Sequence, residues 1–326
     1  MSRDVVRIFK GIAILFMLFL HLFYHQDNWI DITINDTPLM TLLAEATKPV
    51  SFYLLLGGVG RYYLYKHGLN NTQWMRVLKL YIHYWIVLIL FVTLGWIMNP
   101  TVYPGSFINI FSNITGLETT YNHTCWFLLP YVLLTFLSPY LFHCLDRWPK
   151  ITLPVLFCVN MITMFIVSRY GKQYLFDNLW IYNPFLVIHM SFVFTLGATL
   201  FKYWHVIARI IKTLSKYGYL NWIFLLVLVT LRCVVSTDAI NSFYVLLFVV
   251  LFLSAPRLRC VDGFLAHLGD HSMTMWFIHS WYCNCLFHDF IYSFAYPPLI
   301  FLVLFILTYI TSHIIKALAN PIVKRI

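Results

Sequence analysis

The sequence has 326 residues, of which 61% are hydrophobic, 19% are aromatic and only 10% are charged. A soluble globular domain carries about 25% charged residues, so this composition excludes a soluble domain and predicts a polytopic membrane protein. The net charge of +10 is distributed between apolar stretches and forms no single basic patch. It therefore favours cytoplasmic loops and anionic lipid head groups as the surroundings of these charges, and disfavours nucleic acid as a partner.

The apolar stretches predict an all-α bundle of about ten transmembrane helices. Each stretch is close to the roughly 20 residues that a tilted helix needs to cross the bilayer. No internal repeat and no soluble appendage interrupts them, so residues 1–326 are expected to form a single membrane domain. The expected spans cover 5–25, 39–60, 77–98, 126–145, 151–169, 183–201, 219–235, 240–256, 272–291 and 297–317.

The positions of Lys and Arg predict the orientation of the bundle. If the N-terminus is cytoplasmic, all but four of the 22 basic residues lie in cytoplasmic loops or at cytoplasmic helix ends. Because basic residues concentrate on the cytoplasmic side, we expect both termini to be inside and the chain to be a multi-pass protein of the cytoplasmic membrane. The four exceptions are Lys48, Arg169, Lys172 and Arg232.

The first expected span carries a cation and a histidine on one face. Lys10 and His21 are eleven residues apart, which is three turns and about 20° at 100° per residue. The rise between them is roughly 16 Å, about half of the hydrocarbon thickness. An ionisable side chain this deep in a membrane is a functional hypothesis by default, and the alternative is a packing histidine bonded to a neighbouring carbonyl. His25, one turn further on, could complete a metal pair, but no HExxH glutamate accompanies it and no metal is expected.

Four blocks of sequence occur in the order typical of one family. They are VRIFKGIAILFMLFLH (6–21), KPVSFYLLLGG (48–58), CWFLLPYVLL (125–134) and LGDHSMTMWFIHSW (268–281). Together with the ten expected spans, they resemble the membrane-bound acyltransferase-3 family. Two features depart from the family pattern: Lys10 stands where Arg is usual, and Gly57-Gly58 stands where Ser-Gly is usual. Lys cannot form the two-pronged contact with phosphate that Arg forms.

The resemblance implies an acyltransferase that takes an acyl group, most simply acetyl, from cytoplasmic acyl-CoA. The acceptor would be a hydroxyl of an extracytoplasmic glycan or lipid-linked saccharide. His21 would be the general base, or else a transient acyl carrier, because imidazole can accept a proton at neutral pH. The sequence leaves open the acceptor, the acyl chain and the oligomeric state.

The same resemblance suggests roles for the remaining polar residues. Cations near the cytoplasmic side would hold the phosphates of acyl-CoA, although snorkelling and topology setting explain them as well; these are Lys10, Arg61, Arg76 and Lys79. Polar and aromatic residues of the later spans would line the acceptor site, although helix–helix hydrogen bonds and an interfacial aromatic belt are the alternatives; these are His123, Trp126, Ser272 and His279.

Two rival functions predict different observations. A transporter or flippase without covalent chemistry would show paired inverted repeats and broken helices, neither of which is clear in the sequence. A membrane scaffold would tolerate replacement of His21.

Overall fold

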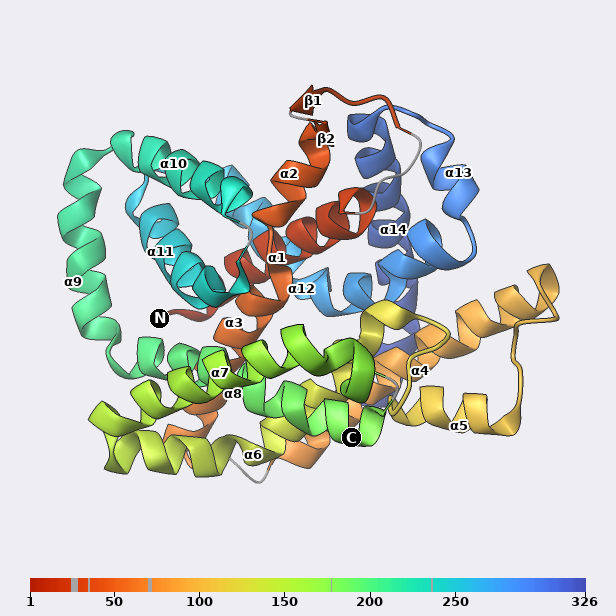
Figure 1. Cartoon of the computed structure of the whole chain (residues 1–326), viewed down its shortest axis with the longest axis horizontal. Coiled ribbons are helices and arrows are strands. Elements are labelled where there is room, and N and C mark those ends of the chain that lie inside the picture. Colours follow the sequence, from red (N-terminus) through yellow and green to blue (C-terminus); the bar gives the residue numbers. More distant parts are fainter. Residues whose placement is uncertain (25–28, 35, 70–71, 177, 236) are drawn as a thin grey trace.

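The structure is a computed structural model that describes residues 1–24, 29–34, 36–69, 72–176, 178–235 and 237–326 (Figure 1). Nearly all of its described elements are helical, which confirms the all-α prediction; the exception is a short antiparallel ribbon in which Thr33 pairs with Pro38. The elements of the first half are α1 (Arg3–Phe23), β1 (Thr33–Ile34), β2 (Thr37–Pro38), α2 (Leu39–Glu45), α3 (Pro49–Lys66), α4 (Gln73–Met98), α5 (Phe107–Thr115), η2 (His123–Phe127), α6 (Leu128–Arg147) and α7 (Pro149–Tyr170). Those of the second half are η3 (Gly171–Leu175), α8 (Leu179–Lys202), α9 (Trp204–Leu214), η4 (Ser215–Tyr217), α10 (Leu220–Val234), η5 (Asp238–Ile240), α11 (Asn241–Ser254), α12 (Arg259–Ser280), η6 (Trp281–Cys285), α13 (His288–Tyr292) and α14 (Pro297–Val323).

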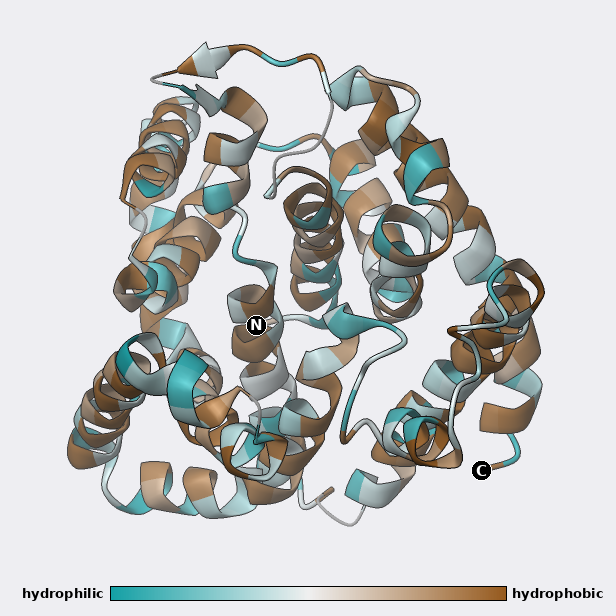
Figure 2. Cartoon of the chain, turned by 45° about the vertical axis from the view of Figure 1, so that its right-hand side comes forward, coloured by the Kyte–Doolittle hydropathy of each residue, from teal (hydrophilic) through white to brown (hydrophobic). Residues whose placement is uncertain are grey.

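Among the residues that the structure describes, seven helical segments are long and apolar enough to cross a membrane. Hydrophobic residues run along most of the helices, as Figure 2 shows. The pair formed by residues 204–217 and α10 is bent by 109° and adds an eighth span if it counts as one. The other expected spans correspond to α11, which is shorter, and to α12, which is more polar. The bundle is therefore that of a polytopic membrane protein, and the number ten and the sidedness stay predictions.

The second expected span, 39–60, consists of two helices. Helix α2 ends at Glu45, and α3 begins at Pro49, which stands at the first helical position where its missing N–H costs nothing. Between them Lys48 has φ 39°, a left-handed conformation that a residue with a Cβ seldom adopts. The sequence has a proline at this break but no glycine, so the left-handed turn could not be predicted from a glycine.

The ninth expected span, which corresponds to α12, differs most from the sequence prediction. Residues 272–291 were expected to form one span, whereas α12 runs from Arg259 to Ser280 and the chain then continues through η6 into the short α13. The polar residues Asp270 and His271 argue against a membrane helix at this point. In the structure Asp270 pairs with Arg7, and His271 bonds Ser312, so neighbouring helices satisfy both side chains.

Glycines allow two helix pairs at the centre of the bundle to touch backbone to backbone. Helix α1 crosses α12, and a Cβ on Gly11 or Gly269 would overlap a carbonyl oxygen of the other helix. Helix α3 meets α8 in the same way through Gly58 and Gly197. Small residues permit such close approach in membranes, where packing and not the hydrophobic effect holds helices together. In Figure 1, α1 and α12 lie near the middle of the bundle.

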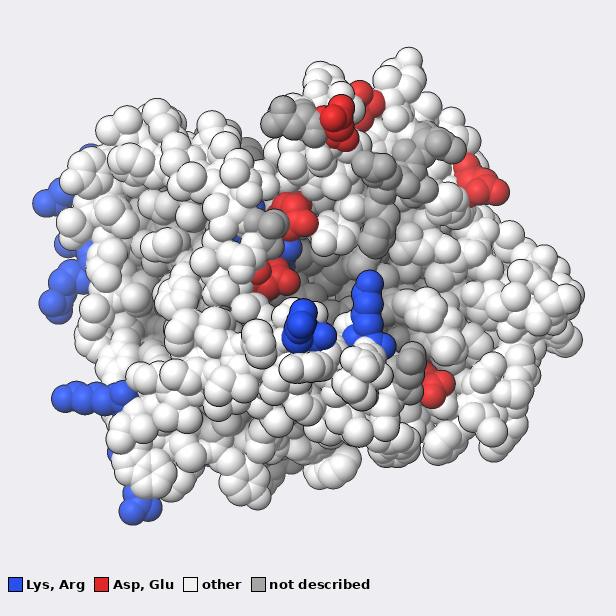
Figure 3. Space-filling view, viewed as in Figure 1, with Lys and Arg blue, Asp and Glu red and all other residues white. Residues whose placement is uncertain are grey.

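Ion pairs join helix ends that the charge rule places on the same side. Lys66 and Lys202 both bond Asp146, which links the C-terminal ends of α3, α6 and α8 on the expected cytoplasmic side. On the expected outer side, Glu45, Lys48, Arg232 and Asp238 form a second cluster. Figure 3 shows a face with acidic side chains over the region of β1, β2 and α13, in the middle and at the lower right, and with Lys and Arg at the left edge and in the middle.

Candidate active site

His21 and His279 meet near the end of the α1–α12 contact. Their ring centroids lie 4.9 Å apart with the ring planes at 47°. The helices run in the same direction, since Gly11 lies against the backbone of Leu265, Gly269 lies against that of Arg7, and the two histidines meet about ten residues beyond these glycines along both helices. The resemblance suggested His21 as the base and His279 as a residue of the acceptor site, and the structure brings the two rings together.

His279 has a defined hydrogen-bonding state. Its ring is fully buried, and Nδ1 lies 2.7 Å from the carbonyl oxygen of Trp276. Because a carbonyl can only accept, Nδ1 carries the proton, and Nε2 of the neutral ring presents a lone pair. Among the described residues Nε2 has no hydrogen-bond partner. A buried lone pair beside His21 is therefore a feature that helix packing alone does not require.

The two cations expected at the start of α1 have different surroundings. Arg7 bonds both carboxylate oxygens of Asp270 and also Asp4, so its charge is neutralised. Lys10 is half-buried on the face of His21; Asp270 lies within electrostatic range of it, but its Nζ makes no hydrogen bond or ion pair with a residue that the structure describes. Of the two, Lys10 is the cation left available for a ligand.

Arg61 on α3 is a buried cation without a partner. Arg61 is 5% exposed, and none of its three guanidinium nitrogens has a hydrogen-bond partner among the described residues. Tyr131 and Arg76 lie within electrostatic range of it. An unpaired charge away from water is costly, and proteins pair such charges unless the partner comes from outside the chain.

The other two expected phosphate ligands lie near the start of α4. Arg76 is exposed, and its Nε donates to Thr72 over 3.2 Å. Lys79 is half-buried. No hydrogen bond, ion pair or ring contact between described residues connects these cations or Arg61 with Lys10, so the structure does not assemble all four into one cluster.

The predicted acceptor residues lie where η2 packs against α12. Trp276 Nε1 donates to the carbonyl of Thr124 over 3.2 Å, and Asn122 Nδ2 donates to that of Phe277 over 3.0 Å. These bonds hold η2 within one turn of His279 along α12. His123 and Trp126, which flank them, are both exposed. Asn122 was not predicted, although it lies three residues before the start of the CWFLLP block at Cys125.

Ser272 has a backbone role in the structure. Its hydroxyl donates to the carbonyl of Gly269 over 2.8 Å, within α12, and the side chain is buried two turns before His279. His25, the other histidine considered at the end of the first span, lies outside the described residues.

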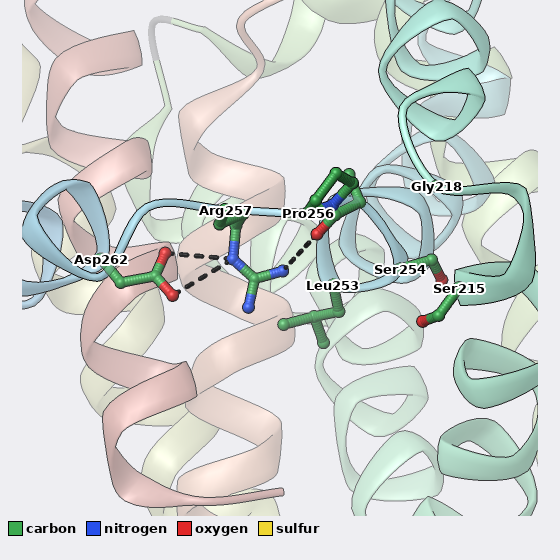
Figure 4. A pocket seen from close by; sticks show the side chains of 8 residues that line it. Ser215, Gly218, Leu253, Ser254, Pro256, Arg257 and Asp262 are labelled. Carbon is green, nitrogen blue, oxygen red and sulfur yellow. Dashed lines mark hydrogen bonds and ion pairs between the residues drawn. The ribbon is translucent and has the colours of Figure 1, made fainter.

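Two hollows lie apart from the histidine pair. One of about 320 Å³ is lined by Ser215, Leu253 and Arg257 (Figure 4). The guanidinium of Arg257 already donates hydrogen bonds to Asp262 and to backbone carbonyls. The other, of about 300 Å³, is apolar and includes Phe16 and Phe19 on the face of α1 opposite His21. Neither hollow offers an unpaired cation.

Residues 5–316 match the family model described as an acyltransferase domain. The chain belongs to the acyltransferase-3 family. No curated protein and no solved structure matches it. As a member of this family the protein is a membrane acyltransferase, and the match extends from the first turn of α1 into the last helix, so every predicted site residue lies within the family domain.

Proposed function

We propose that this acyltransferase moves an acyl group, in the first instance acetyl, from cytoplasmic acyl-CoA to a hydroxyl of an extracytoplasmic glycan or lipid-linked saccharide at the cytoplasmic membrane. The observation that carries the proposal is the His21–His279 pair on the central α1–α12 crossing, with the unpaired cations Lys10 and Arg61 in the half of the bundle expected to face the cytoplasm. A base at the centre and anion-binding groups on the donor side are what transfer from a charged thioester requires.

In the proposed reaction, His21 acts as a general base on the acceptor hydroxyl. The acceptor hydroxyl oxygen attacks the thioester carbonyl carbon while His21 takes the hydroxyl proton. The new ester C–O bond forms, the C–S bond breaks, and the imidazolium of His21 returns the proton to the departing CoA sulfur. If His21 instead carries the acyl group, the same atoms are transferred in two steps.

His279 is assigned as a positioning residue for His21. Its Nδ1–H is committed to Trp276, so the lone pair on Nε2 points from a fixed ring. A neutral partner of this kind favours one positive charge in the pair, because two adjacent imidazolium rings would repel each other in a poorly solvated site.

The phosphates of acyl-CoA are assigned to the cationic side chains. Arg61 supplies a guanidinium that has no hydrogen-bond partner in the described part of the chain, and a planar guanidinium can bind phosphate through two parallel hydrogen bonds. Arg76 and Lys79 extend the positive charge toward the expected cytoplasmic surface, and Lys10 lies between that surface and His21. On the other side, exposed His123 and Trp126 flank the η2–α12 contact and are assigned to the saccharide, whose apolar face stacks on aromatic rings.

The function is tested with purified protein in lipid nanodiscs and with whole cells. The protein should consume acetyl-CoA and release CoA, and mass spectrometry of surface glycans should show an acyl group that disappears when the gene is deleted. Donor consumption distinguishes an enzyme from a transporter. Identical glycan masses with and without the gene, together with no thioester cleavage, would overturn the proposal.

A further inference from the structure

Three histidines from two helices gather at a distance from the His21–His279 pair. His267 and His271 stand one turn apart on α12, and His313 faces them from α14. One nitrogen from each ring can be chosen so that all three lie within 4.8 Å of one another. His271 precedes His279 by eight residues, about 12 Å along the helix, so the cluster is separate from the proposed catalytic pair.

The protonation of His271 can be worked out from its neighbours. Nδ1 lies 2.8 Å from the hydroxyl oxygen of Ser312, and that hydroxyl donates its only proton to the carbonyl of Tyr309 over 2.6 Å. Ser312 must therefore accept from His271, so Nδ1 carries the hydrogen and Nε2 carries a lone pair. Metal-binding histidines are oriented in this way, with the second ring nitrogen donating to a neighbour.

A cation already lies opposite that lone pair. Lys316 Nζ is 3.5 Å from His271 Nε2, and it also bonds the carbonyl of Asp270 over 3.3 Å. The Asp270 carboxylate bonds Arg7 and also lies within electrostatic range of Lys316 and His271. A metal ion at the lone pair of His271 must therefore displace the Lys316 ammonium group.

The other two rings are also suited to act as ligands. His267 Nε2 lies 2.7 Å from the hydroxyl of Tyr309, which can fix that nitrogen as the donor and leave Nδ1 as the ligand. His313 is exposed and makes no hydrogen bond with a described residue, and its ring centroid is 4.2 Å from that of His271. The set therefore offers three imidazole rings and no carboxylate.

We propose that His267, His271 and His313 form a binding site for a divalent transition metal ion such as Zn²⁺. Imidazole suits Zn²⁺, Cu²⁺ and Ni²⁺, and zinc–nitrogen bonds of about 2.0–2.1 Å require the nitrogens to be roughly 3.4 Å apart in a tetrahedron. Small ring rotations bring the nitrogens to that spacing, and the ion replaces Lys316 at the lone pair of His271. A water molecule completes the fourth position. This inference departs from the sequence prediction, which expected no metal.

The test uses the full-length protein, purified with a tag that contains no histidine and stripped with a chelator. Co²⁺ is the probe, because tetrahedral Co²⁺ absorbs visible light strongly, whereas octahedral Co²⁺ absorbs weakly. One Co²⁺ per chain with the strong bands, displaced by Zn²⁺, is expected. His313→Gln and His267→Gln change exposed residues and should each lower the affinity at least tenfold.

Two further variants make the test specific. His143→Gln removes an exposed histidine on α6 and should leave Co²⁺ binding unchanged. Lys316→Met removes the competing ammonium group and should tighten binding several-fold. Absence of stoichiometric binding, binding that survives His313→Gln, or an equal loss in His143→Gln would overturn the metal site and leave the cluster as a hydrogen-bonded packing contact. None of these outcomes depends on the acyl-transfer reaction.

Discussion

Arg7 and Lys10 stand one turn apart on α1, and only Arg7 is neutralised by carboxylates. Asp270 and Asp4 both bond the Arg7 guanidinium, so this residue fastens α1 to α12. Lys10 lies within electrostatic range of Asp270 but makes no hydrogen bond or ion pair with a described residue, although it lies in the same turn. We therefore expect Arg7 to have a structural role and Lys10 a role in ligand binding, and substitutions should distinguish the two roles.

Lys10→Ala is expected to raise the KM for acyl-CoA about tenfold or more with little effect on use of the acceptor. A hydrogen bond to a charged group contributes about 1.5–3 kcal/mol, and 1.4 kcal/mol is a factor of ten. Lys10→Arg should retain most activity, since Arg is the usual residue of the family. Steady-state kinetics in nanodiscs gives both constants, and an unchanged KM for acyl-CoA in Lys10→Ala would contradict the assignment.

Asp270→Asn is the matched control for Lys10. It removes the carboxylate that joins Arg7 to α12 and should lower thermal stability, because it leaves a partly buried guanidinium with Asp4 as its remaining carboxylate partner among the described residues. If Lys10→Ala and Asp270→Asn lost stability equally, Lys10 would be a structural residue too.

Arg61→Met should stabilise the protein while weakening its use of acyl-CoA. The guanidinium is buried without a partner, so replacing it with an apolar side chain of similar length is expected to raise the free energy of unfolding by about 1–3 kcal/mol. The KM for acyl-CoA should rise at the same time. Thermal denaturation with and without CoA measures both effects, since CoA should stabilise the wild type and not the variant.

Arg232 provides the comparison for Arg61. It is equally buried, at 1% exposure, but it bonds Asn241 and the carbonyl of Val235 and lies near two carboxylates. Arg232→Met should therefore destabilise the protein by about 3–5 kcal/mol and leave the KM of any folded fraction unchanged. Equal destabilisation by Arg61→Met and Arg232→Met would show that Arg61 has a structural partner.

Gly58→Ala is expected to disrupt the bundle, and Gly60→Ala is not. The added methyl group on Gly58 would overlap the backbone of α8, whereas nothing lies within 4 Å of the same group on Gly60. Both glycines lie in α3, so the helix propensity gained by alanine is the same for each, up to about 1 kcal/mol. Thermal melting should show a clear loss for Gly58→Ala and no loss, or a small gain, for Gly60→Ala.

Single-cysteine labelling tests the predicted orientation. In a variant without the native cysteines, Cys at Ile32 and Glu118 should react with an impermeant reagent in sealed cells, and Cys at Lys212 should react only after lysis. Ile32 is exposed and suits the substitution. Its neighbour Asp31 does not, because the Asp31 carboxylate accepts hydrogen bonds from the backbone of Ile32 and Met40 and holds the β1–β2 region in place. Labelling of Lys212→Cys in sealed cells would reverse the topology and the assignment of the donor side.

The sequence predicted the elements better than their ends. Apolar length alone located α4 and α7 to within four residues. It misplaced α12, because Asp270 and His271 look too polar for a span until Arg7 and Ser312, far away in the chain, are seen to satisfy them. Hydropathy records one residue at a time, whereas the cost of a buried polar group depends on its partner.

The same limit applies to the candidate site. The spacing of Lys10 and His21 on one helix was enough to predict that they share a face. That His279 meets His21, and that Arg61 has no partner while Arg232 has several, depends on contacts between helices. No pattern within a single helix contains that information.

His21→Gln should abolish acyl transfer while protein level, membrane insertion and acyl-CoA binding stay normal. The glutamine amide can still hydrogen-bond where the imidazole does, but it cannot take a proton at neutral pH. General-base catalysis contributes about 100- to 10,000-fold, so the loss in kcat should be at least 100-fold.

His279→Asn retains a donor for the carbonyl of Trp276 and should lower kcat less than His21→Gln, with an unchanged KM. His143→Gln, on the exposed surface of α6, should have normal kinetics. Near-normal glycan acylation by His21→Gln at equal protein level would exclude His21 as the base, and loss of acyl-CoA binding in that variant would indicate a packing role instead.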